Sequence, residues 1–305
     1  MTYKIFVIIV THNGTLWYER CFNSLRLSTL PVHTVVVDNA STDDTANYIT
    51  SNFPEIQLIQ SEVNLGFGQG NNKGIRYAVE NGANYVFLLN QDAWIEQDTI
   101  EQLVDISKRH PEYGILSPLH LNASKTGIEE GLMHYIADYK TTSPQFIEDL
   151  YFQRLSEIYP TNYVNAAAWL LPRNTLEIVG GFDPIFFHYG EDDNYMQRVR
   201  FHKMKIGLCP LVTICHDTER REIKKHFKNI SSLTCLLVKL ADINAKSSSR
   251  HFILFSIRKA IQKALKLKLK ETSILFIQAS FVFRVRKRIH ASKVQNKKRV
   301  SSWLN

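Results

Sequence analysis

The stretch IFVIIVTHN, residues 5–13, decides the fold: it is an apolar run rich in Val and Ile that ends abruptly in polar side chains. Short, continuous apolar runs of this kind are typical of strands buried on both faces of a parallel sheet. Three later runs share the plan, at Thr34–Val37, Ile56–Gln60 and Tyr85–Leu89. Helical patterns alternate with them at Leu16–Leu27, Asp43–Asn52 and Asn71–Asn81. This alternation predicts an α/β fold with a right-handed, doubly wound parallel sheet.

The middle of the chain continues the alternation less regularly. Ser41 or Thr42 is the expected cap of the second helix, because acidic Asp43 and Asp44 follow. Residues from about 119 to 160 have mixed polarity, which predicts an irregular insertion. The remaining expected elements are a helix at Asp98–Lys108, a strand at Gly114–Ser117, a strand at Tyr163–Leu171, helices at Thr175–Val179 and Asp193–His202, and a strand pair at Lys205–Cys215.

Charge is distributed unevenly along the 305 residues, although the formal net charge is only +8. From Arg220 onward there are 22 Lys and Arg residues against 3 Asp and Glu, whereas the residues before it have 15 against 26. The segments 250–270 and 272–290 alternate apolar and basic residues, as amphipathic helices on anionic membranes do. A helical bundle packed on the main domain with its basic face in water is the alternative. No aromatic-stacking module accompanies the charge, so no nucleic-acid partner is expected.

The pattern of apolar residues and cysteines favours a cytoplasmic protein. Peripheral binding to the inner face of the cell membrane, through the basic tail, is a further option. The first apolar run is too short for a signal peptide, and no run reaches the ~18 apolar residues that span a bilayer. The four cysteines, at 21, 209, 215 and 235, form no C-x-x-C pair. We expect them to be reduced thiols in the core.

Polar and acidic residues follow the strands, where ligands of such sheets bind. Asp92 follows the run YVFLLN (85–90), and its carboxylate suits Mg²⁺ or Mn²⁺ bound to a diphosphate. Taken alone, Asp92 fits a helix-cap or turn aspartate better, since Asp is common after strands. His216 follows the last expected strand and is either a second metal ligand, favouring Mn²⁺, or a structural histidine.

Acidic residues also gather at the start of a helix in GGFDPIFFHYGEDDNYMQR (180–198). Glu191, Asp192 and Asp193 follow aromatic residues that form partly apolar walls, at Phe186, Phe187 and Tyr189. Such surroundings raise the pKa of a carboxyl group and suit a general base. Ordinary helix capping is the alternative.

The stretch NLGFGQGNNKG (64–74) predicts a glycine-rich loop whose backbone comes close to a ligand. A flexible turn is the alternative. It matches neither a dinucleotide fingerprint nor a Walker loop, because Asn71 stands where the third glycine would be and the stretch follows the third strand.

Five motifs in this order resemble those of the family 2 inverting glycosyltransferases with the GT-A fold, especially rhamnosyltransferase-like members of polysaccharide assembly. The resemblance covers about residues 4–217 and rests on VIIVTHNG (7–14), VVVDNASTDDT (35–45), NLGFGQGNNKGI (64–75), LLNQDA (88–93) and GGFDPIFFHYGED (180–192) followed by Arg198. It implies a Rossmann-like, mostly parallel central sheet flanked by helices. The implied organisation is a catalytic domain at 1–219, with a nucleotide-sugar half at about 1–93 and an acceptor half at about 94–219, and a basic helical extension at 220–305.

The resemblance also implies roles for individual residues. Asp192 is the implied catalytic base, with Glu191 beside it, and Asp92 and His216 are the implied ligands of Mg²⁺ or Mn²⁺. Thr11 and Asp38 would hold the nucleobase, with Asp38 accepting the imide N–H of uracil or thymine. Further donor-binding residues implied by the motifs are Asn13, Asn39, Ser41, Asn64, Gly66, Gly68, Asn72, Asn90 and Gln91.

Two positions depart from the family pattern. Asn90 replaces the first acid of the D-x-D motif, so that Asp92 alone must hold the metal together with the diphosphate, and Asn194 replaces the last acid of E-D-x-D. The implied reaction is a single in-line displacement that inverts the anomeric carbon, with backbone N–H groups of the loop Gly66–Gly74 adding stabilisation.

The expected partners are a UDP- or dTDP-sugar donor and a glycan or lipid-linked glycan acceptor. Two other classes of function stay open: a nucleotide-sugar nucleotidyltransferase and a non-catalytic glycan- or nucleotide-binding protein. The oligomeric state also stays open, with a homodimer among the options.

Overall fold

A computed structural model describes residues 3–136, 143–218, 227–246, 248–300 and 302–304. One mixed sheet runs through the molecule in the strand order β3-β2-β1-β4-β8-β6-β9-β5, with β7 paired to β9. The first half comprises β1 (Ile5–Thr11), α1 (Tyr18–Arg26), β2 (His33–Asn39), α2 (Thr45–Asn52), β3 (Gln57–Ser61), α3 (Gly66–Glu80) and β4 (Tyr85–Leu89). The second half comprises β5 (Ala93–Ile95), α4 (Thr99–Arg109), β6 (Tyr113–Leu121), α5 (Glu130–Ile136), α6 (Pro144–Tyr151), β7 (Tyr159–Pro160), β8 (Ala168–Pro172), α7 (Arg173–Ile178), α8 (Glu191–Phe201) and β9 (Lys205–His216). The helices α9 (Phe227–Ala241), α10 (Ser249–Ala264) and α11 (Leu269–Asn296) follow.

The predicted parallel half is confirmed. β1 lies between β2 and β4 and is parallel to both, and β3 extends the sheet beyond β2. Successive β1 side chains alternate between two apolar clusters: Val7 packs with α1, α2 and α4, whereas Ile8 packs with α3, α7 and α8. Both faces of the strand are therefore buried, which explains why its sequence is continuously apolar.

The second half of the sheet is mixed. β8 runs antiparallel to β4 and to β6, while β9 is parallel to β6 and antiparallel to β5. The pairing of β5 with β9 places Ala93 opposite His216. This register brings Asp92 and His216 together from positions far apart in the chain.

The glycine-rich stretch is helical and not the expected loop. α3 begins at Gly66, five residues before the helix that we predict. Backbone N–H groups beyond its first turn bond within the helix, so they cannot all face a ligand. A Cβ on Gly70 would lie 2.7 Å from a Val10 methyl, and one on Gly74 would lie 2.4 Å from Ile8. These glycines therefore let α3 lie close against β1.

Several other element boundaries differ from expectation. α2 begins after Asp44, and neither Ser41 nor Thr42 caps it. The expected strand at Tyr163–Leu171 begins only at Ala168, and the expected strand pair at Lys205–Cys215 is one strand. The register between β6 and β9 shifts where Pro118 pairs with Cys209 and Leu119 pairs with Thr213. Residues 210–212 of β9 therefore have no partner on β6, yet β9 continues as one strand. The expected insertion contains the end of β6, α5, α6 and β7.

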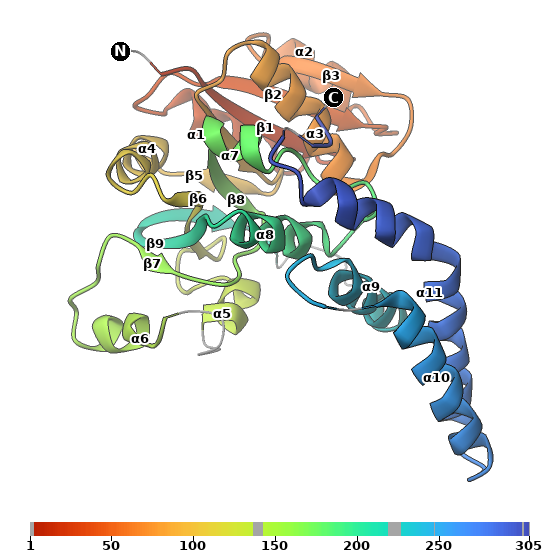
Figure 1. The fold of residues 1–305 in the computed structure, drawn as a ribbon. Coiled ribbons are helices and arrows are strands. Elements are labelled where there is room, and N and C mark those ends of the chain that lie inside the picture. Colours follow the sequence, from red (N-terminus) through yellow and green to blue (C-terminus); the bar gives the residue numbers. More distant parts are fainter. Residues whose placement is uncertain (1–2, 137–142, 219–226, 247, 301, 305) are drawn as a thin grey trace.

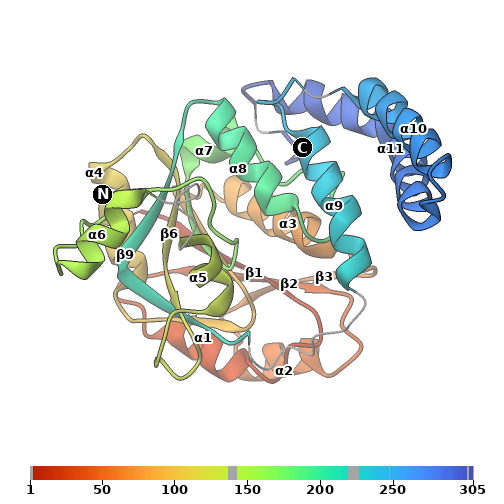
Figure 2. The same ribbon diagram turned by 90° about the horizontal axis from the view of Figure 1, so that it is seen from below.

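The basic C-terminal segment is helical in its described part. Leu236, Leu240, Val282 and Ile289 of α9 and α11 form one apolar cluster with Phe186 of the loop before α8. The hairpin of α10 and α11 then projects away from the sheet (Figures 1 and 2). The predicted boundary at 219/220 lies outside the described residues and stays a prediction.

Two expectations about the whole chain can be compared with the structure. In the described segments, no helix combines the length and the apolar character needed to cross a bilayer. Cys21, Cys209 and Cys215 are buried, as expected for core thiols, but Cys235 is exposed on α9. The prediction of a core position is therefore wrong for Cys235.

Candidate functional site

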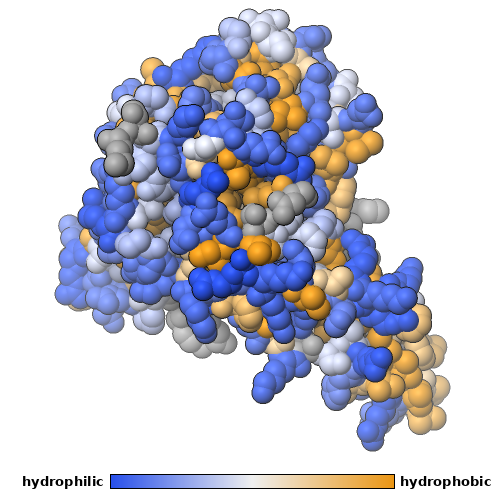
Figure 3. Space-filling view, turned by 45° about the horizontal axis from the view of Figure 1, so that its top comes forward, coloured by the Kyte–Doolittle hydropathy of each residue, from blue (hydrophilic) through white to orange (hydrophobic). Residues whose placement is uncertain are grey.

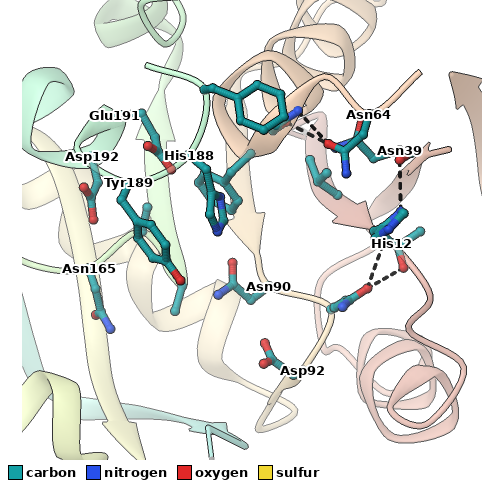
Figure 4. Close-up of a pocket in the computed structure, with 18 of the residues that line it drawn as sticks. His12, Asn39, Asn64, Asn90, Asp92, Asn165, His188, Tyr189, Glu191 and Asp192 are labelled. Carbon is teal, nitrogen blue, oxygen red and sulfur yellow. Dashed lines mark hydrogen bonds between the residues drawn. The ribbon is translucent and has the colours of Figure 1, made fainter. Parts of the chain in front are cut away.

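A cavity of about 540 Å³ opens at the carboxyl ends of β1, β2 and β4 (Figure 4). Its far wall comes from the loop before α8 and from the first turn of α8. Sequence-predicted residues from all five motifs meet here, namely Thr11, Asn39, Asn64, Gly66, Asn90, Gln91, Asp92, Glu191, Asp192 and His216. The two acids of the expected mechanism, Asp92 and Asp192, therefore line one cavity.

Thr11 is held by side chains from two other elements. Its hydroxyl donates to Gln91 Oε1 at 2.5 Å and lies 2.5 Å from the Tyr18 hydroxyl. The backbone N–H of His12 donates to the same Gln91 oxygen at 3.1 Å. These bonds fix the ends of β1 and β4 relative to each other at the cavity floor.

A second network fixes the edge of the cavity at the start of α3. The Asn39 side chain donates to Asn64 Oδ1 at 3.0 Å and accepts from the Leu65 N–H at 2.7 Å. Gly66 has φ +76°, and a Cβ there would lie 1.9 Å from the carbonyl oxygen of Phe187. Only glycine fits this contact between α3 and the loop before α8.

Three predicted donor-binding residues support the loop after β2 and are not part of the cavity wall. Asp38 Oδ1 accepts from the Ser41 N–H at 3.0 Å. Ser41 Oγ accepts from the N–H of Asn13, also at 3.0 Å. Asp38 is 4% exposed, so a ligand that reaches its carboxylate must enter beside this loop.

Gly68 and Asn72 also do not line the cavity. Gly68 packs against Phe182, where a Cβ would lie 3.0 Å from the Phe182 side chain. The Asn72 amide donates to the carbonyl oxygen of Phe182 at 2.8 Å and accepts from its N–H at 2.6 Å. The structure places both residues in the contact between α3 and the Phe182 segment, so their expected contact with the donor has no support in this geometry.

Asp92 and His216 form a buried pair on the cavity wall. Asp92 Oδ1 lies 3.3 Å from His216 Nε2, and both residues are 3% exposed. The Asn90 amide nitrogen lies 3.4 Å from the same ring nitrogen. A carboxylate beside an imidazole fits a divalent cation, and the imidazole favours Mn²⁺ over Mg²⁺. Asn90 occupies the position of the missing acid and adds no charge.

Asp192 lies in the first turn of α8, opposite the Asp92 pair. Its Oδ2 accepts from the Tyr163 hydroxyl at 2.8 Å, and its Oδ1 accepts from the Asp193 N–H at 2.8 Å. Burial raises the pKa of Asp192 above its usual value, and the Tyr163 hydrogen bond partly counteracts this. Burial and the nearby Asp192 charge also raise the pKa of Tyr163, so it stays a hydroxyl donor.

Glu191 lies in surroundings that disfavour the ionised form of its carboxyl group. Burial, and then the charge of Asp192, raises its pKa to about 7. Within the described part of the chain, no hydrogen-bond partner reaches its buried Oε2. A carboxyl group that ionises near neutral pH suits proton transfer. The expectation that these surroundings raise the pKa of the acidic cluster therefore agrees with the structure.

The loop before α8 forms an aromatic wall between the two acidic regions. Figure 4 shows the side chains of His188 and Tyr189 between the α8 acids and Asn90. Phe187 also lines the cavity and is 63% exposed. Phe186, which we expect in this wall, is instead buried against α9 and α11, because it points to the opposite side of the loop.

Several site residues are absent from the sequence-based prediction. His12, Trp17, Asn165 and His188 line the cavity, and Tyr163 bonds to Asp192. His12 and His188 lie within the motifs quoted above, so the sequence could have identified them as site residues. Tyr163 and Asn165 come from a segment whose sequence predicts a strand. Only the structure places Asn165 in the cavity wall and the Tyr163 hydroxyl against Asp192.

Comparison with protein families and curated proteins finds clear relatives. The model described as "Glycosyl transferase family 2" matches residues 6–162. The chain is 27% identical to an N-acetylglucosaminyl-diphospho-decaprenol L-rhamnosyltransferase of Mycobacterium tuberculosis, over 63% of this chain and 69% of that one. It is 26% identical to the low-salt glycan biosynthesis hexosyltransferase Agl10 of Haloferax volcanii, over 60% of this chain. That match spans only 58% of the Haloferax protein.

Solved structures share the fold at low identity. TarS of S. aureus (residues 1–349, in complex with UDP) matches with a TM-score of 0.58 and 17% identity, over 96% of this chain and 89% of that one. GalNAc-T7 with UDP, GalNAc and Mn²⁺ matches with a TM-score of 0.63 and 15% identity, over 99% of this chain and 56% of that one. The predicted GT-A architecture is thereby confirmed.

Proposed function

Because the chain belongs to glycosyl transferase family 2, we propose that it transfers a sugar from a UDP- or dTDP-sugar to an acceptor hydroxyl, with inversion at the anomeric carbon. The observation that carries the proposal is that Asp92, His216 and Asp192 line one cavity, whose size suits a nucleotide sugar. The dTDP-rhamnosyl transferase RfbF of Shigella flexneri, a further relative, makes dTDP-rhamnose the first donor to test. The rhamnosyltransferase of M. tuberculosis makes a lipid-linked glycan the first acceptor.

Asp92 and His216 would hold the metal ion. A bound Mg²⁺ or Mn²⁺ supplies positive charge that offsets the charge growing on the leaving diphosphate. The imidazole favours Mn²⁺, the ion present in the GalNAc-T7 structure. Asn90 and Gln91 present polar side chains at the same edge and orient the donor beside the pair.

Asp192 would act as the general base. Its carboxylate takes the proton of the acceptor hydroxyl while that oxygen bonds to the anomeric carbon and the bond from this carbon to the diphosphate oxygen breaks. Tyr163 holds Oδ2 of Asp192, which fixes the carboxylate for the attack. The raised pKa of Asp192 makes it a stronger base than a solvated aspartate.

Asp193 provides a matched control for the base assignment. It is the next residue on α8, and burial raises its pKa to about 7, but it is not part of the cavity wall. Asp192→Asn should reduce turnover by ~10²-fold or more with donor binding nearly intact. Asp193→Asn should keep most of the activity. Near-normal turnover of Asp192→Asn would remove Asp192 from the base role.

Donor binding and product analysis test the reaction class. A panel of nucleotide sugars, with and without Mn²⁺, should show a metal-dependent thermal shift for the true donor. Turnover should release free nucleoside diphosphate. Pyrophosphate exchange would instead indicate a nucleotidyltransferase, and metal-dependent binding without turnover on a matched acceptor would indicate a binding protein.

The hairpin of α10 and α11 supports contact with an anionic membrane. Leu265 and Leu267 at its tip are 81% and 84% exposed, and exposed Lys266 and Lys268 alternate with them. Figure 3 shows apolar residues gathered at this far end of the molecule. Apolar side chains flanked by lysines can insert between anionic head groups.

Vesicle flotation with the full chain tests this contact. The wild type should bind vesicles that contain phosphatidylglycerol, and the double variant Leu265→Glu/Leu267→Glu should not. Leu211→Glu changes an exposed leucine of the catalytic domain and should bind like the wild type. No binding by the wild type would favour a helical bundle whose basic face is solvated.

A further inference from the structure

A second cluster of metal-ligating side chains lies beside the cavity. One ligand atom each of His120, Glu129 and His216 lies within 4.8 Å of the others, and all three residues are buried. His216 lines the cavity, whereas His120 and Glu129 do not. Of the three residues, His216 therefore connects the cluster to the cavity wall.

Backbone pairing holds the three residues together. β6 runs parallel to β9, with His120 opposite Ile214 and Leu121 opposite Cys215, so His216 lies one step further along. The chain then turns back, and the Glu129 N–H donates to the carbonyl oxygen of His120 at 2.9 Å. Backbone hydrogen bonds thus fix where the three residues lie relative to one another.

His120 keeps a nitrogen available for a ligand. Its Nε2 lies 3.3 Å from Ser117 Oγ. In the described segments no hydrogen-bond partner reaches its Nδ1, although the residue is 0% exposed. A fully buried imidazole with one nitrogen that has no hydrogen-bond partner is unusual in a core, and that nitrogen can bind a metal.

Glu129 is oriented by the helix that follows it. Its carboxylate accepts from the N–H groups of Gly131 at 3.0 Å and Leu132 at 2.8 Å, at the start of α5. The Thr218 hydroxyl donates to it at 3.2 Å. A carboxylate offers about four acceptor positions, so these bonds leave room for a metal.

We propose that His120, Glu129 and His216 bind a zinc-like transition-metal ion at a site beside the donor cavity. Two imidazoles and a carboxylate are a ligand set that proteins use for Zn²⁺, and imidazole disfavours Mg²⁺. Tetrahedral ligands of Zn²⁺ lie about 3.3 Å apart, so small side-chain rotations close the site.

The bound ion would fix His216 next to Asp92. A histidine that binds a metal usually donates its other N–H to a carboxylate, and Asp92 Oδ1 lies 3.3 Å from His216 Nε2. With zinc bound, His216 would therefore orient Asp92, and Asp92 would hold the donor's metal ion without His216. The ion would hold the imidazole and thereby the edge of the cavity. The binding site stands independently of the proposed function, whereas this effect on the cavity rests on it.

Zinc titration of the chelator-treated full chain, without nucleotide and with a chromophoric competitor, tests the site. The wild type should bind Zn²⁺, and Co²⁺ in its place should give the visible spectrum of a four-coordinate ion. His120→Gln and Glu129→Gln should each weaken binding at least about 100-fold, more than loss of an outer-sphere partner does. His110→Gln, a surface histidine paired with Glu157, should bind like the wild type.

Separate nucleotide measurements keep this proposal distinct from the proposed function. Asp92→Asn should weaken Mn²⁺-dependent UDP binding but cost zinc binding no more than about 10- to 100-fold. Circular dichroism without zinc checks the fold of each variant. A wild type that binds zinc no more tightly than His120→Gln overturns the metal site, whether or not UDP binding survives. Zinc binding without any UDP binding would instead overturn the proposed function alone.

Discussion

Replacing Glu191 with glutamine should stabilise the protein at alkaline pH and change its stability little below about pH 4.5. Burial, and then the charge of Asp192, raises the pKa of Glu191 from 4.5 to about 7. The folded state therefore prefers the neutral acid. The free energy of unfolding should fall as pH rises through this range, because the unfolded chain releases the proton first. The difference between the two pKa values corresponds to about 3 kcal/mol at pH 8 and above.

Glutamine keeps the shape of this side chain and cannot ionise, so the Glu191→Gln variant should escape that loss. Urea unfolding of both proteins at pH 4.5, 6 and 8.5 measures the difference. We expect a gain that grows from near zero to about 3 kcal/mol. Glu80→Gln, at an exposed glutamate on α3, should show no such trend. A stability difference that is the same at all three pH values, or a less stable variant at pH 8.5, would refute the reasoning.

Three further predictions concern other parts of the molecule. Tyr163→Phe removes a hydrogen bond that lowers the pKa of Asp192, so the acidic limb of the pH profile of kcat/KM should move to higher pH. An unchanged profile would contradict Asp192 as the base. Gly66→Ala places a Cβ 1.9 Å from the carbonyl oxygen of Phe187, at a residue with positive φ. Urea unfolding should show that the free energy of unfolding falls by at least ~1–3 kcal/mol. A variant as stable as the wild type would contradict this. Thiol labelling of the native chain should modify Cys235 fast and the three buried thiols only on unfolding; fast labelling of a second thiol would contradict the observed burial.

The sequence predicts the parallel half of the sheet because strands buried on both faces are continuously apolar. Val7 and Ile8 face opposite apolar clusters, so the whole strand is apolar. The glycine-rich stretch shows where such reading fails. Glycine serves both open loops and close helix packing, and only the contacts of Gly70 with Val10 and of Gly74 with Ile8 distinguish the two.

The candidate site was predictable in part. Polar residues at strand ends and acids at a helix start mark the cavity, since parallel strands end at one edge of the sheet. Asn72 is also a polar residue of a quoted motif, but its side chain bonds to the backbone of Phe182 and does not line the cavity. The sequence does not identify Tyr163 as a site residue, because its segment is predicted to be a strand. Only the folded chain brings its hydroxyl to Asp192.

The sequence by itself determined the class of fold, the family, and which polar residues follow which strands, because these depend on local periodicity and on motif order. The tertiary structure decided which of those residues face one another. Asp92 meets His216 only because β5 pairs with β9 in one register, and His120 meets Glu129 only because the chain reverses after β6. Distances between side chains far apart in sequence depend on strand pairing and packing, and a single sequence records neither.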